Sequence, residues 1–369
     1  MRRTAILPTP ATGLATLLGA LLLSSCSLVG GSGDDDGSAT DGGSGATDGA
    51  AAGGTVVLVT HDSFSLPKKL ISQFEADTGY DLELRSNGDA GSLTSQLVLN
   101  AENPLGDVAF GVDNTFGGRA LEGGVFTAYD GELPPGVEDF ALPGDDEGAL
   151  VPVDNGDVCV NVDLDWFERE GIAPPEDLDD LLDPAYEDLF VTSGATTSSP
   201  GFAFLLATIA EFGSDWQGYW EDLLANGAKV VRGWEDAYFV DFTAGGGGGD
   251  RPIVLSYDSS PAFTTDGEGG TTTGALLQTC FEQVEYVGAL AGAENPEGAQ
   301  AVIEWMLSEE VQAALPESMY VFPVLDGVEL PEDWARFAPR PEEPLAVDPA
   351  DIEANRDTWL REWQDLVSR

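Results

Sequence analysis

Polar side chains gather at three places where the sequence predicts that a buried strand ends. These segments are His61-Asp62-Ser63, Asn87-Gly88-Asp89 and Gly111-Val112-Asp113-Asn114. In α/β proteins the chain turns toward a helix at the carboxyl ends of parallel strands, and ligands bind there. We therefore expect these turns to lie at a ligand site, with His61, Asp62, Asp89 and Asp113 as the candidate ligand-binding residues.

A run of hydroxyl side chains precedes an apolar helix predicted at 200–212. Ser199 is placed as the N-cap and Pro200 as the first helical residue. The start of a helix offers free backbone N–H groups and the positive end of the helix dipole, which together bind anions. A plain helix cap accounts for Ser199 and Pro200 alone, whereas the further hydroxyls of Thr196, Thr197 and Ser198 favour a phosphate site.

Two clusters combine aromatic rings with carboxylates and hydroxyls. One is the segment 233–238, which contains Trp234, and the other is 256–261, which contains Tyr257, Asp258, Ser259 and Ser260. An aromatic face beside a carboxylate suits a planar cationic heterocycle, through stacking and cation–π attraction. Either cluster alone also fits a protein core.

The composition argues against catalysis and against nucleic acid as a partner. The chain has one histidine, so it cannot form a zinc site built on several histidines, and it offers a single candidate histidine for a Ser-His-Asp relay. It contains no G-x-S-x-G motif. Its formal net charge is −51, and phosphate backbones require clustered Lys and Arg. We therefore predict a binding protein that is not an enzyme, with no cofactor and no metal.

The N-terminal residues predict export. Arg2 and Arg3 precede the apolar stretch 14–23, and Leu23-Ser24-Ser25-Cys26 is typical of a bacterial lipobox. We interpret residues 1–25 as a signal peptide and Cys26 as the lipidated residue. Residues 26–54 are rich in Gly, Ser and Asp and predict a disordered tether. The protein is then anchored to the outer face of the cytoplasmic membrane by its lipid.

Two further cysteines, Cys159 and Cys280, follow the tether. Two cysteines in an oxidising compartment are more often bridged than free. We therefore expect a Cys159–Cys280 disulfide rather than a catalytic thiol.

The remaining chain, 55–369, is long for one core and natural for two domains. Alternating strand and helix patterns indicate an α/β class with buried sheets. Five consecutive glycines, Gly245 to Gly249, predict a flexible surface insertion, because no Lys-Ser/Thr follows as in a phosphate loop. We assign an N-terminal lobe to 55–153 plus about 283–315, and a C-terminal lobe to about 154–282 plus 316–369. The predicted strands are 55–60, 81–85, 107–110, 153–163, 229–231, 253–257 and 280–287, and the predicted helices are 67–78, 92–101, 174–182, 200–212, 216–225, 296–314 and the tail from 349.

Several of these motifs together resemble the thiamine-binding subunit of bacterial thiamine ABC transporters. They occur in the same order over nearly the whole body of the chain. The motifs are Thr60-His61-Asp62-Ser63-Phe64, Gly111 to Asn114, Ser198-Ser199-Pro200-Gly201, Gly233-Trp234-Glu235-Asp236-Ala237-Tyr238, Leu255 to Ala262, Pro316 to Val324 and Arg356 to Arg369.

The resemblance implies a type II periplasmic-binding-protein fold, with two lobes of mixed sheets flanked by helices and a hinge of crossing strands. It implies that the cleft holds thiamine, thiamine monophosphate or thiamine diphosphate, and that a monomer delivers the ligand to ABC permease and ATPase subunits. By position, Asp89 falls on a pyrimidine-binding carboxylate and Ser198 and Ser199 on phosphate contacts. Trp234, the run Tyr257 to Ser260 and Tyr320 also fall on binding positions. The chain departs from the family pattern at His61, where tyrosine is frequent, and at Tyr320, where tryptophan is expected.

Three alternatives remain open at this point. A ferric-ion-binding protein of the same fold needs clustered phenolates, and the chain has no adjacent tyrosine pair. Polyamine binding suits the acidity but leaves the serine-rich segment without a purpose. A thiamine-degrading enzyme needs a cysteine nucleophile in the cleft, and Cys159 and Cys280 are its candidates.

Overall fold

The first strand, β1 (Gly54–Thr60), lies inside a sheet because both of its faces are apolar. Val56 and Leu58 are buried on one face and Val59 on the other. β2 (Tyr80–Ser86) and β3 (Val108–Asp113) pair with β1 in parallel, one on each side. The computed structural model describes residues 53–369, so the predicted signal peptide, Cys26 and nearly all of the predicted tether lie outside the described residues.

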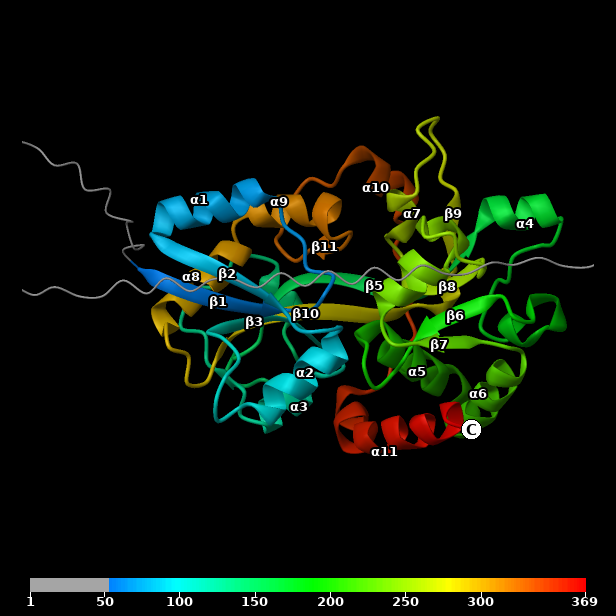
Figure 1. The fold of residues 1–369 in the computed structure, drawn as a ribbon, viewed down its shortest axis with the longest axis horizontal. Helices are drawn as coiled ribbons and strands as arrows, with labels where there is room; N and C mark the ends of the chain where they lie inside the picture. Colours follow the sequence, from blue (N-terminus) through cyan, green and yellow to red (C-terminus); the bar gives the residue numbers. More distant parts are fainter. Residues whose placement is uncertain (1–52) are drawn as a thin grey trace, which may run out of the picture. The chain divides into compact units, whose positions relative to one another are not determined.

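Two long strands join the parallel halves of one continuous mixed sheet. β10 (Phe281–Leu290) runs antiparallel between β3 and β5 (Val151–Asp163). Beyond β5 the order continues with β8 (Ile253–Tyr257), β6 (Phe190–Ser193) and β7 (Lys229–Val231), as Figure 1 shows. Short strands extend β5 and β10: β4 (Phe126–Thr127), β9 (Thr273–Ala275) and β11 (Phe322–Pro323).

The half of the sheet that contains β1 is covered by helices on both faces. On one face, Val56 packs in a cluster with Phe74, Ile303 and Leu315. On the other face, Val59 packs with Leu93 and Ala120. The helices of the first face are α1 (Lys68–Thr78), α8 (Pro296–Met306) and α9 (Glu309–Ser318), and those of the second are α2 (Ala90–Leu99) and α3 (Gly117–Glu122).

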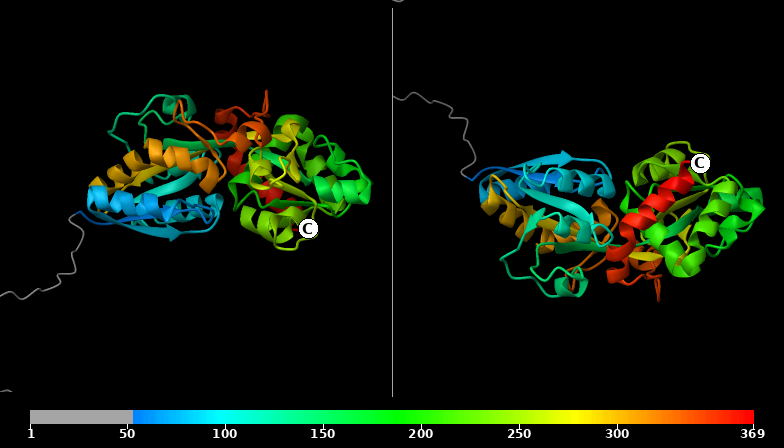
Figure 2. Two further views of the ribbon diagram at one scale, coloured as in Figure 1. Left: turned by 90° about the horizontal axis from the view of Figure 1, so that it is seen from above. Right: turned by 90° about the horizontal axis from the view of Figure 1, so that it is seen from below.

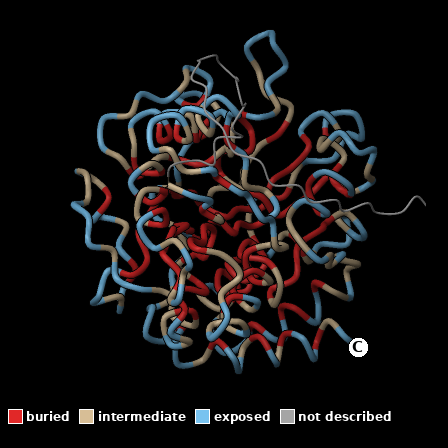
Figure 3. The backbone as a smooth tube through the Cα atoms, turned by 60° about the vertical axis from the view of Figure 1, so that its left-hand side comes forward, coloured by how far each residue is buried: buried red, intermediate tan, exposed pale blue. Residues whose placement is uncertain are grey.

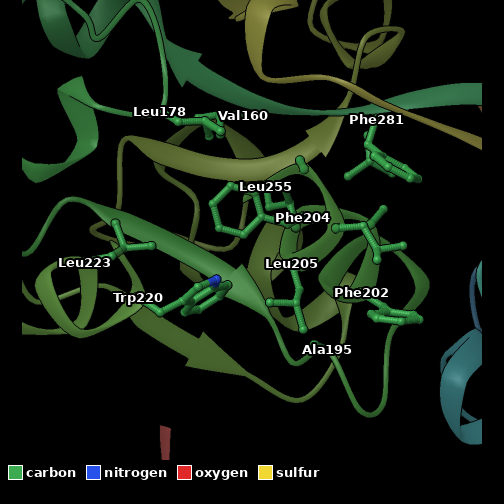
Figure 4. Close-up of a cluster of buried hydrophobic side chains, with 14 of the residues drawn as sticks. Val160, Leu178, Ala195, Phe202, Phe204, Leu205, Trp220, Leu223, Leu255 and Phe281 are labelled. Carbon is green, nitrogen blue, oxygen red and sulfur yellow. The ribbon is translucent and has the colours of Figure 1, made fainter. Parts of the chain in front are cut away.

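The other half of the sheet has its own, larger core, part of which Figure 4 shows. Trp220 lies at its centre, with its ring 5.5 Å from that of Phe204 and 5.5 Å from that of Trp363. These side chains come from α6 (Trp216–Ala225), α5 (Ser199–Phe212) and α11 (Pro349–Val367). Trp363 of the predicted C-terminal helix is therefore a core residue.

The two ends of the sheet form separate bodies in the views of Figure 2, and β5 and β10 run between them. Buried residues follow the sheet strands through the middle of the molecule in Figure 3, while the outer helices carry exposed faces. All of this belongs to one compact unit, Gly49–Arg369. The remaining helices are α4 (Leu164–Glu170), α7 (Ser260–Phe263) and α10 (Glu332–Phe337).

Two predicted helices are wrong in extent. Residues 174–182 form only a short 3₁₀ turn, Asp180–Leu182, because Asp177 and Asp180 accept hydrogen bonds from backbone N–H groups that a helix would use. The helix predicted at 296–314 is interrupted after Met306, since the Ser308 hydroxyl accepts from the Val311 N–H and starts a new helix, α9.

The glycine run 245–249 is packed against the chain beside it. A side-chain carbon at Gly245, Gly247 or Gly249 would overlap the backbone of a π-helical turn, Asp236–Asp241. The glycines therefore let the backbone approach this turn closely. The sequence had predicted a flexible insertion and not this close packing.

Cys159 of β5 and Cys280, which directly precedes β10, are joined in a disulfide with a Cα–Cα distance of 4.2 Å. The bond ties together the two strands that connect the halves of the sheet. None of the helices in the described part of the chain combines the length and apolarity that a membrane span requires.

Candidate functional site

A cavity of about 710 Å³ lies where segments from both halves of the sheet meet. Its size falls within the range of about 300–1,000 Å³ that is common for small-molecule sites. It collects seven of the residues predicted from the sequence, which come from distant parts of the chain. They are His61, Asp89, Ser199, Trp234, Tyr257, Ser260 and Tyr320.

Asp89 connects the two halves at the edge of the cavity. It is the N-cap of α2, and its Oδ1 accepts from the Ala90 N–H at 2.7 Å. Its Oδ2 accepts from the Trp234 N–H at 2.8 Å. Burial raises the pKa of Asp89, although the hydrogen bond from the Trp234 N–H acts in the opposite direction. One carboxylate thus caps a helix of the first half and holds an aromatic segment of the second.

Aromatic rings form one side of the cavity. The rings of Trp234 and Tyr238 stack with centroids 5.1 Å apart, and Tyr257 meets Trp234 edge-on at 6.2 Å. Trp234 is fixed by its Nε1, which donates to the Ser256 hydroxyl at 3.0 Å. Phe263 and Tyr320 add a second aromatic pair, 4.8 Å apart. Flat rings held in this way suit a flat ligand.

Three aromatic lining residues were not predicted from the sequence: Tyr238, Phe239 and Phe263. Tyr238 and Phe239 lie in the π-helical turn Asp236–Asp241. Such turns are rare and are frequent at functional sites. Tyr238 belongs to the aromatic cluster 233–238 but was not singled out, and Phe239 lies beyond that cluster, because helical periodicity does not predict which side chains a π turn presents.

A buried acidic group, Glu285, lines the cavity from β10. Its Oε1 is 3.4 Å from Nε2 of His61. Burial opposes the charge of His61, but the attraction of Glu285 outweighs it and raises the pKa of the imidazole. Nδ1 of His61 accepts from the Ser63 N–H at 3.2 Å, which leaves Nε2 as the proton-bearing nitrogen that faces Glu285.

Two more carboxyl groups flank Glu285 on the neighbouring strands. Glu285 is paired in register with Asp154 of β5 and with Asp113 of β3. Burial, the Glu285 charge and a hydrogen bond with Glu285 hold the pKa of Asp154 well above its usual range. Burial raises the pKa of Asp113 to about 6. Of these three carboxyl groups, Glu285 is the one that lines the cavity.

Glu285 and Gln283, a second unpredicted lining residue, stand at alternate positions of β10. Alternate residues of a strand share a face.

Five predicted ligand residues lie outside the cavity lining and serve local structure. Asp62 accepts from the Gly88 N–H at 3.0 Å. Asp113 accepts from the N–H groups of Thr115 and Phe116. Ser259 donates to the Tyr320 carbonyl at 2.6 Å. The other two, Ser198 and Asp258, are fully buried.

The serine-rich helix start differs from its prediction by one residue. The N-cap is Ser198 rather than Ser199, and the Ser198 hydroxyl donates to the Ser193 hydroxyl at 2.9 Å. Ser199 is the hydroxyl that reaches the cavity, and it faces the Asp113 carboxylate. A phosphate at this helix start would thus meet a single free serine side chain with carboxyl groups nearby.

Asp258 belongs to an ion-pair network centred on Arg340, a residue that the sequence did not single out. Arg340 lies 2.7 Å from Asp157 and 3.1 Å from Asp258, and it donates to Oδ1 of Asn155 at 2.6 Å. Its guanidinium also lies 4.6 Å from the centre of the Phe322 ring. This network joins the segment after α10 to β5 and to the end of β8.

Among residues 53–369, no group of three or more His, Cys, Asp or Glu side chains is arranged to hold a metal ion. The cavity instead combines aromatic faces with carboxylates at two places, Asp89 and Glu285. This arrangement can bind a flat, positively charged organic molecule.

Comparisons with known proteins agree with this architecture. Residues 103–341 match the model of the family described as bacterial extracellular solute-binding protein. The thiamine-binding periplasmic protein of Escherichia coli K12 is 29% identical over 321 residues, which are 85% of this chain and 94% of that protein. The thiamine-binding periplasmic protein of Brucella suis is 27% identical, with 85% of this chain and 92% of that protein covered.

A solved periplasmic thiamin binding protein superposes with a TM-score of 0.75 at 28% identity, covering 86% of this chain and 97% of that one. The resemblance to thiamine-binding proteins and the type II periplasmic-binding-protein fold are thereby confirmed. The chain belongs to the family of bacterial extracellular solute-binding proteins.

Proposed function

We propose that this protein captures thiamine in the cavity and delivers it to an ABC importer. The observation that carries the proposal is the combination of stacked aromatic rings with a buried carboxylate, Glu285, in one cavity. Thiamine contains an aminopyrimidine ring and a positively charged thiazolium ring. Its two rings and its charge therefore match the two kinds of surface that the cavity offers.

Each end of the ligand has a proposed partner. Asp89 accepts a hydrogen bond from the amino group of the pyrimidine, as its position in the family resemblance implies. Trp234, Tyr257 and Tyr320 enclose the rings. Glu285 provides the carboxylate that faces the thiazolium, and the raised pKa of Asp154 limits the negative charge beside it.

Unesterified thiamine fits this cavity better than its phosphate esters do. The Ser198 hydroxyl is engaged with Ser193, and Asp113 faces the remaining hydroxyl of Ser199. A phosphate placed there would approach carboxyl groups at short range, which is unfavourable in a buried site. Binding in the order thiamine, monophosphate, diphosphate is therefore expected.

The two halves of the molecule act as lobes in this proposal, with boundaries near those expected from the sequence, and β5 and β10 form the hinge. Closure of such lobes around a solute gives the importer a defined shape to recognise. We further propose that Cys26 carries a lipid, that the tether holds the protein at the outer face of the cytoplasmic membrane, and that it works as a monomer with permease and ATPase subunits.

Two alternatives receive less support. A thiamine-degrading enzyme needs a free cysteine nucleophile in the cleft, whereas Cys159 and Cys280 are paired. A ferric site needs phenolate ligands, but burial raises the pKa of Tyr257 and of Tyr238 above the ordinary value. Neutral phenols in an apolar wall suit a stacked organic ring better than a hard metal ion.

A thermal unfolding scan with single ligands tests the proposal. A ligand that binds only the folded protein stabilises it by about 2.7 kcal/mol at a hundredfold excess over its dissociation constant. Thiamine is expected to raise the melting temperature more than its phosphate esters do. A rise with ferric ion or spermidine and none with thiamine would refute the assignment.

A further inference from the structure

A second, polar hollow of about 780 Å³ lies beside the cavity, and we infer that it binds a phosphate-class oxyanion. Its lining is made of hydroxyl and amide side chains and one arginine, and it contains no carboxylate among the described residues. The most important of these lining residues are Asn87, Ser92, Ser95, Thr197 and Arg232. This site, the Arg232 groove, is independent of the proposed thiamine site.

The Arg232 groove lies on the seam between the two halves of the molecule. Asn87, Ser92 and Ser95 belong to the first half, whereas Thr197 and Arg232 belong to the second. The Ser92 N–H donates to the Thr197 carbonyl at 3.0 Å and holds the two sides together. An anion bound in the groove would therefore contact both halves at once.

The groove and the cavity share three chain segments. Asn87, Thr197 and Arg232 line the groove, and two residues further on Asp89, Ser199 and Trp234 line the cavity. The hydrogen bond from the Trp234 N–H to Asp89 stands between the two spaces. Neighbouring spaces thus have opposite chemistry, with carboxylates and aromatic rings on one side and donors on the other.

Arg232 brings a positive charge to the groove in a chain where such charge is scarce, with 15 Lys and Arg against 66 Asp and Glu. Seven of the described cationic side chains form ion pairs, including those of Arg85, Arg340 and Arg356. Within the described residues, Arg232 and Arg119 have no carboxylate within 4.0 Å, and Nη1 of Arg119 donates to the groove hydroxyl of Ser95 at 3.4 Å. Unpaired guanidinium groups are the usual partners of phosphate oxygens.

Within residues 53–369, two donors at the groove are free, the Asn87 amide and the Arg232 guanidinium, whereas the hydroxyls of Ser92, Ser95 and Thr197 donate to backbone carbonyls. The Asn87 side-chain nitrogen is buried and has no hydrogen-bond partner among the described residues. The side chain of Arg232 makes no hydrogen bond there either. The two adjacent acids, Asp62 and Asp89, accept from backbone N–H groups of Gly88, Ala90 and Trp234. A buried amide donor without a partner is costly unless a ligand or solvent satisfies it.

Calorimetric titration with inorganic phosphate, in a chloride buffer of matched ionic strength, tests the inference. The wild-type protein should bind one phosphate per chain, and Arg232→Gln should weaken binding by about tenfold to a hundredfold, the usual value of a charge-assisted contact. Arg361→Gln removes one exposed positive charge from α11, far along the chain, and serves as the control. Circular dichroism verifies that each variant is folded.

Failure of wild-type protein to bind phosphate, or equal affinity in wild type and Arg232→Gln, would overturn the inference. A second titration distinguishes the source of the phosphate. If inorganic phosphate still binds after saturation with thiamine monophosphate, the groove takes a free anion. If the ester blocks it, the groove holds the phosphate of the ester, and then Arg232→Gln should weaken the ester as well. Neither result depends on whether unesterified thiamine binds.

Discussion

At the scale of single residues, the ligand preference of the cavity depends on three neighbouring carboxyl groups. Glu285, Asp113 and Asp154 occupy matching positions on three adjacent strands, and like charges so close together cannot all be ionised at low cost. The raised pKa values of Asp154 and Asp113 show how the conflict is resolved. Glu285 is the one of the three that lines the cavity, where it can meet a cationic ligand.

Glu285→Gln should therefore weaken thiamine binding by about 1.5–3 kcal/mol, since a contact to a charged group is lost. A thiamine analogue in which carbon replaces the positively charged ring nitrogen should bind wild type and variant almost equally. Calorimetry with both ligands measures the difference. Asp154→Asn is the matched control, because it keeps a donor to Glu285 and leaves the charge at the cavity. An equal loss for the neutral analogue would contradict the role given to Glu285.

Asp113 gives the stability of the protein a defined dependence on pH. Burial raises its pKa to about 6, whereas an unfolded chain has an Asp pKa of about 3.9. The folded state therefore binds the proton more tightly, and this stabilisation is complete below about pH 4 and lost as the pH rises through about 6.

Asp113→Asn, which cannot titrate, isolates this effect. Between about pH 4 and about pH 7, the free energy of unfolding of the wild type should fall by about 2–3 kcal/mol relative to that of Asp113→Asn. Denaturant titrations at several pH values measure it. Parallel pH profiles for the two proteins would show that Asp113 titrates as in an unfolded chain.

Much of the site could be predicted from the sequence because its motifs lie at strand ends and helix starts. Asp89 was named for this reason, Trp234 and Tyr257 were named from their aromatic and polar clusters, and all three line the cavity. Ser198 and Asp258 were also named, but sequence position does not determine whether a polar side chain faces a ligand or a neighbouring residue. Glu285 was missed because its partners, Asp154 and Asp113, become neighbours only when β10 is inserted between β3 and β5.

At the scale of elements, β5 and β10 carry the connection between the halves of the molecule. β5 is buried along all 13 of its residues, and the Cys159–Cys280 disulfide ties it to the chain just before β10. Arg340 adds a contact from the segment after α10 to Asn155, Asp157 and Asp258. These contacts fix the strands about which any opening of the cavity must occur.

Arg340→Gln should destabilise the folded protein. The carboxylates of Asp157 and Asp258, which are almost fully buried, would lose their counter-ion. Breaking a fully buried pair costs about 3–5 kcal/mol, and because Arg340 is 37% exposed we expect about 2 kcal/mol. Urea unfolding measures the change. Arg336→Gln, on α10, is the control, because Arg336 forms no ion pair among the described residues.

Strands were easier to predict than helix ends. The buried runs of β1, β3 and β8 are continuous and apolar, and the structure places strands there. The helix predicted at 174–182 failed because aspartate side chains bind backbone N–H groups locally, and the long helix at 296–314 failed because Ser308 caps a new helix within it. Both errors come from competition between side chains and the helical backbone.

At the scale of the whole molecule, the two halves touch closely beside the cavity. Gly91 of α2 packs against the backbone of the segment before α5. A side-chain carbon at Gly91 would lie 2.8 Å from the Thr197 carbonyl carbon and 3.1 Å from the Ser198 nitrogen. The two halves can therefore approach this closely only because residue 91 is a glycine.

Gly91→Ala should hinder closure and weaken thiamine binding by at least about 1.4 kcal/mol, a factor of ten. The free energy of unfolding should change by about 1 kcal/mol or less, since alanine favours helix and the halves can move apart. Gly218→Ala, at an open position of α6, is the control and should leave affinity unchanged. Unchanged affinity in Gly91→Ala would mean that binding does not require this contact.

Calorimetric titration of the wild-type protein and of Trp234→Ala with thiamine tests most directly whether the cavity binds this ligand. We predict one saturable site per chain in the wild type. We also predict that loss of the Trp234 ring weakens binding by about 1–3 kcal/mol, the scale of stacking between a flat heterocycle and an aromatic side chain. The absence of saturable binding to the wild type, or the same affinity in both proteins, would contradict the proposed function of the cavity.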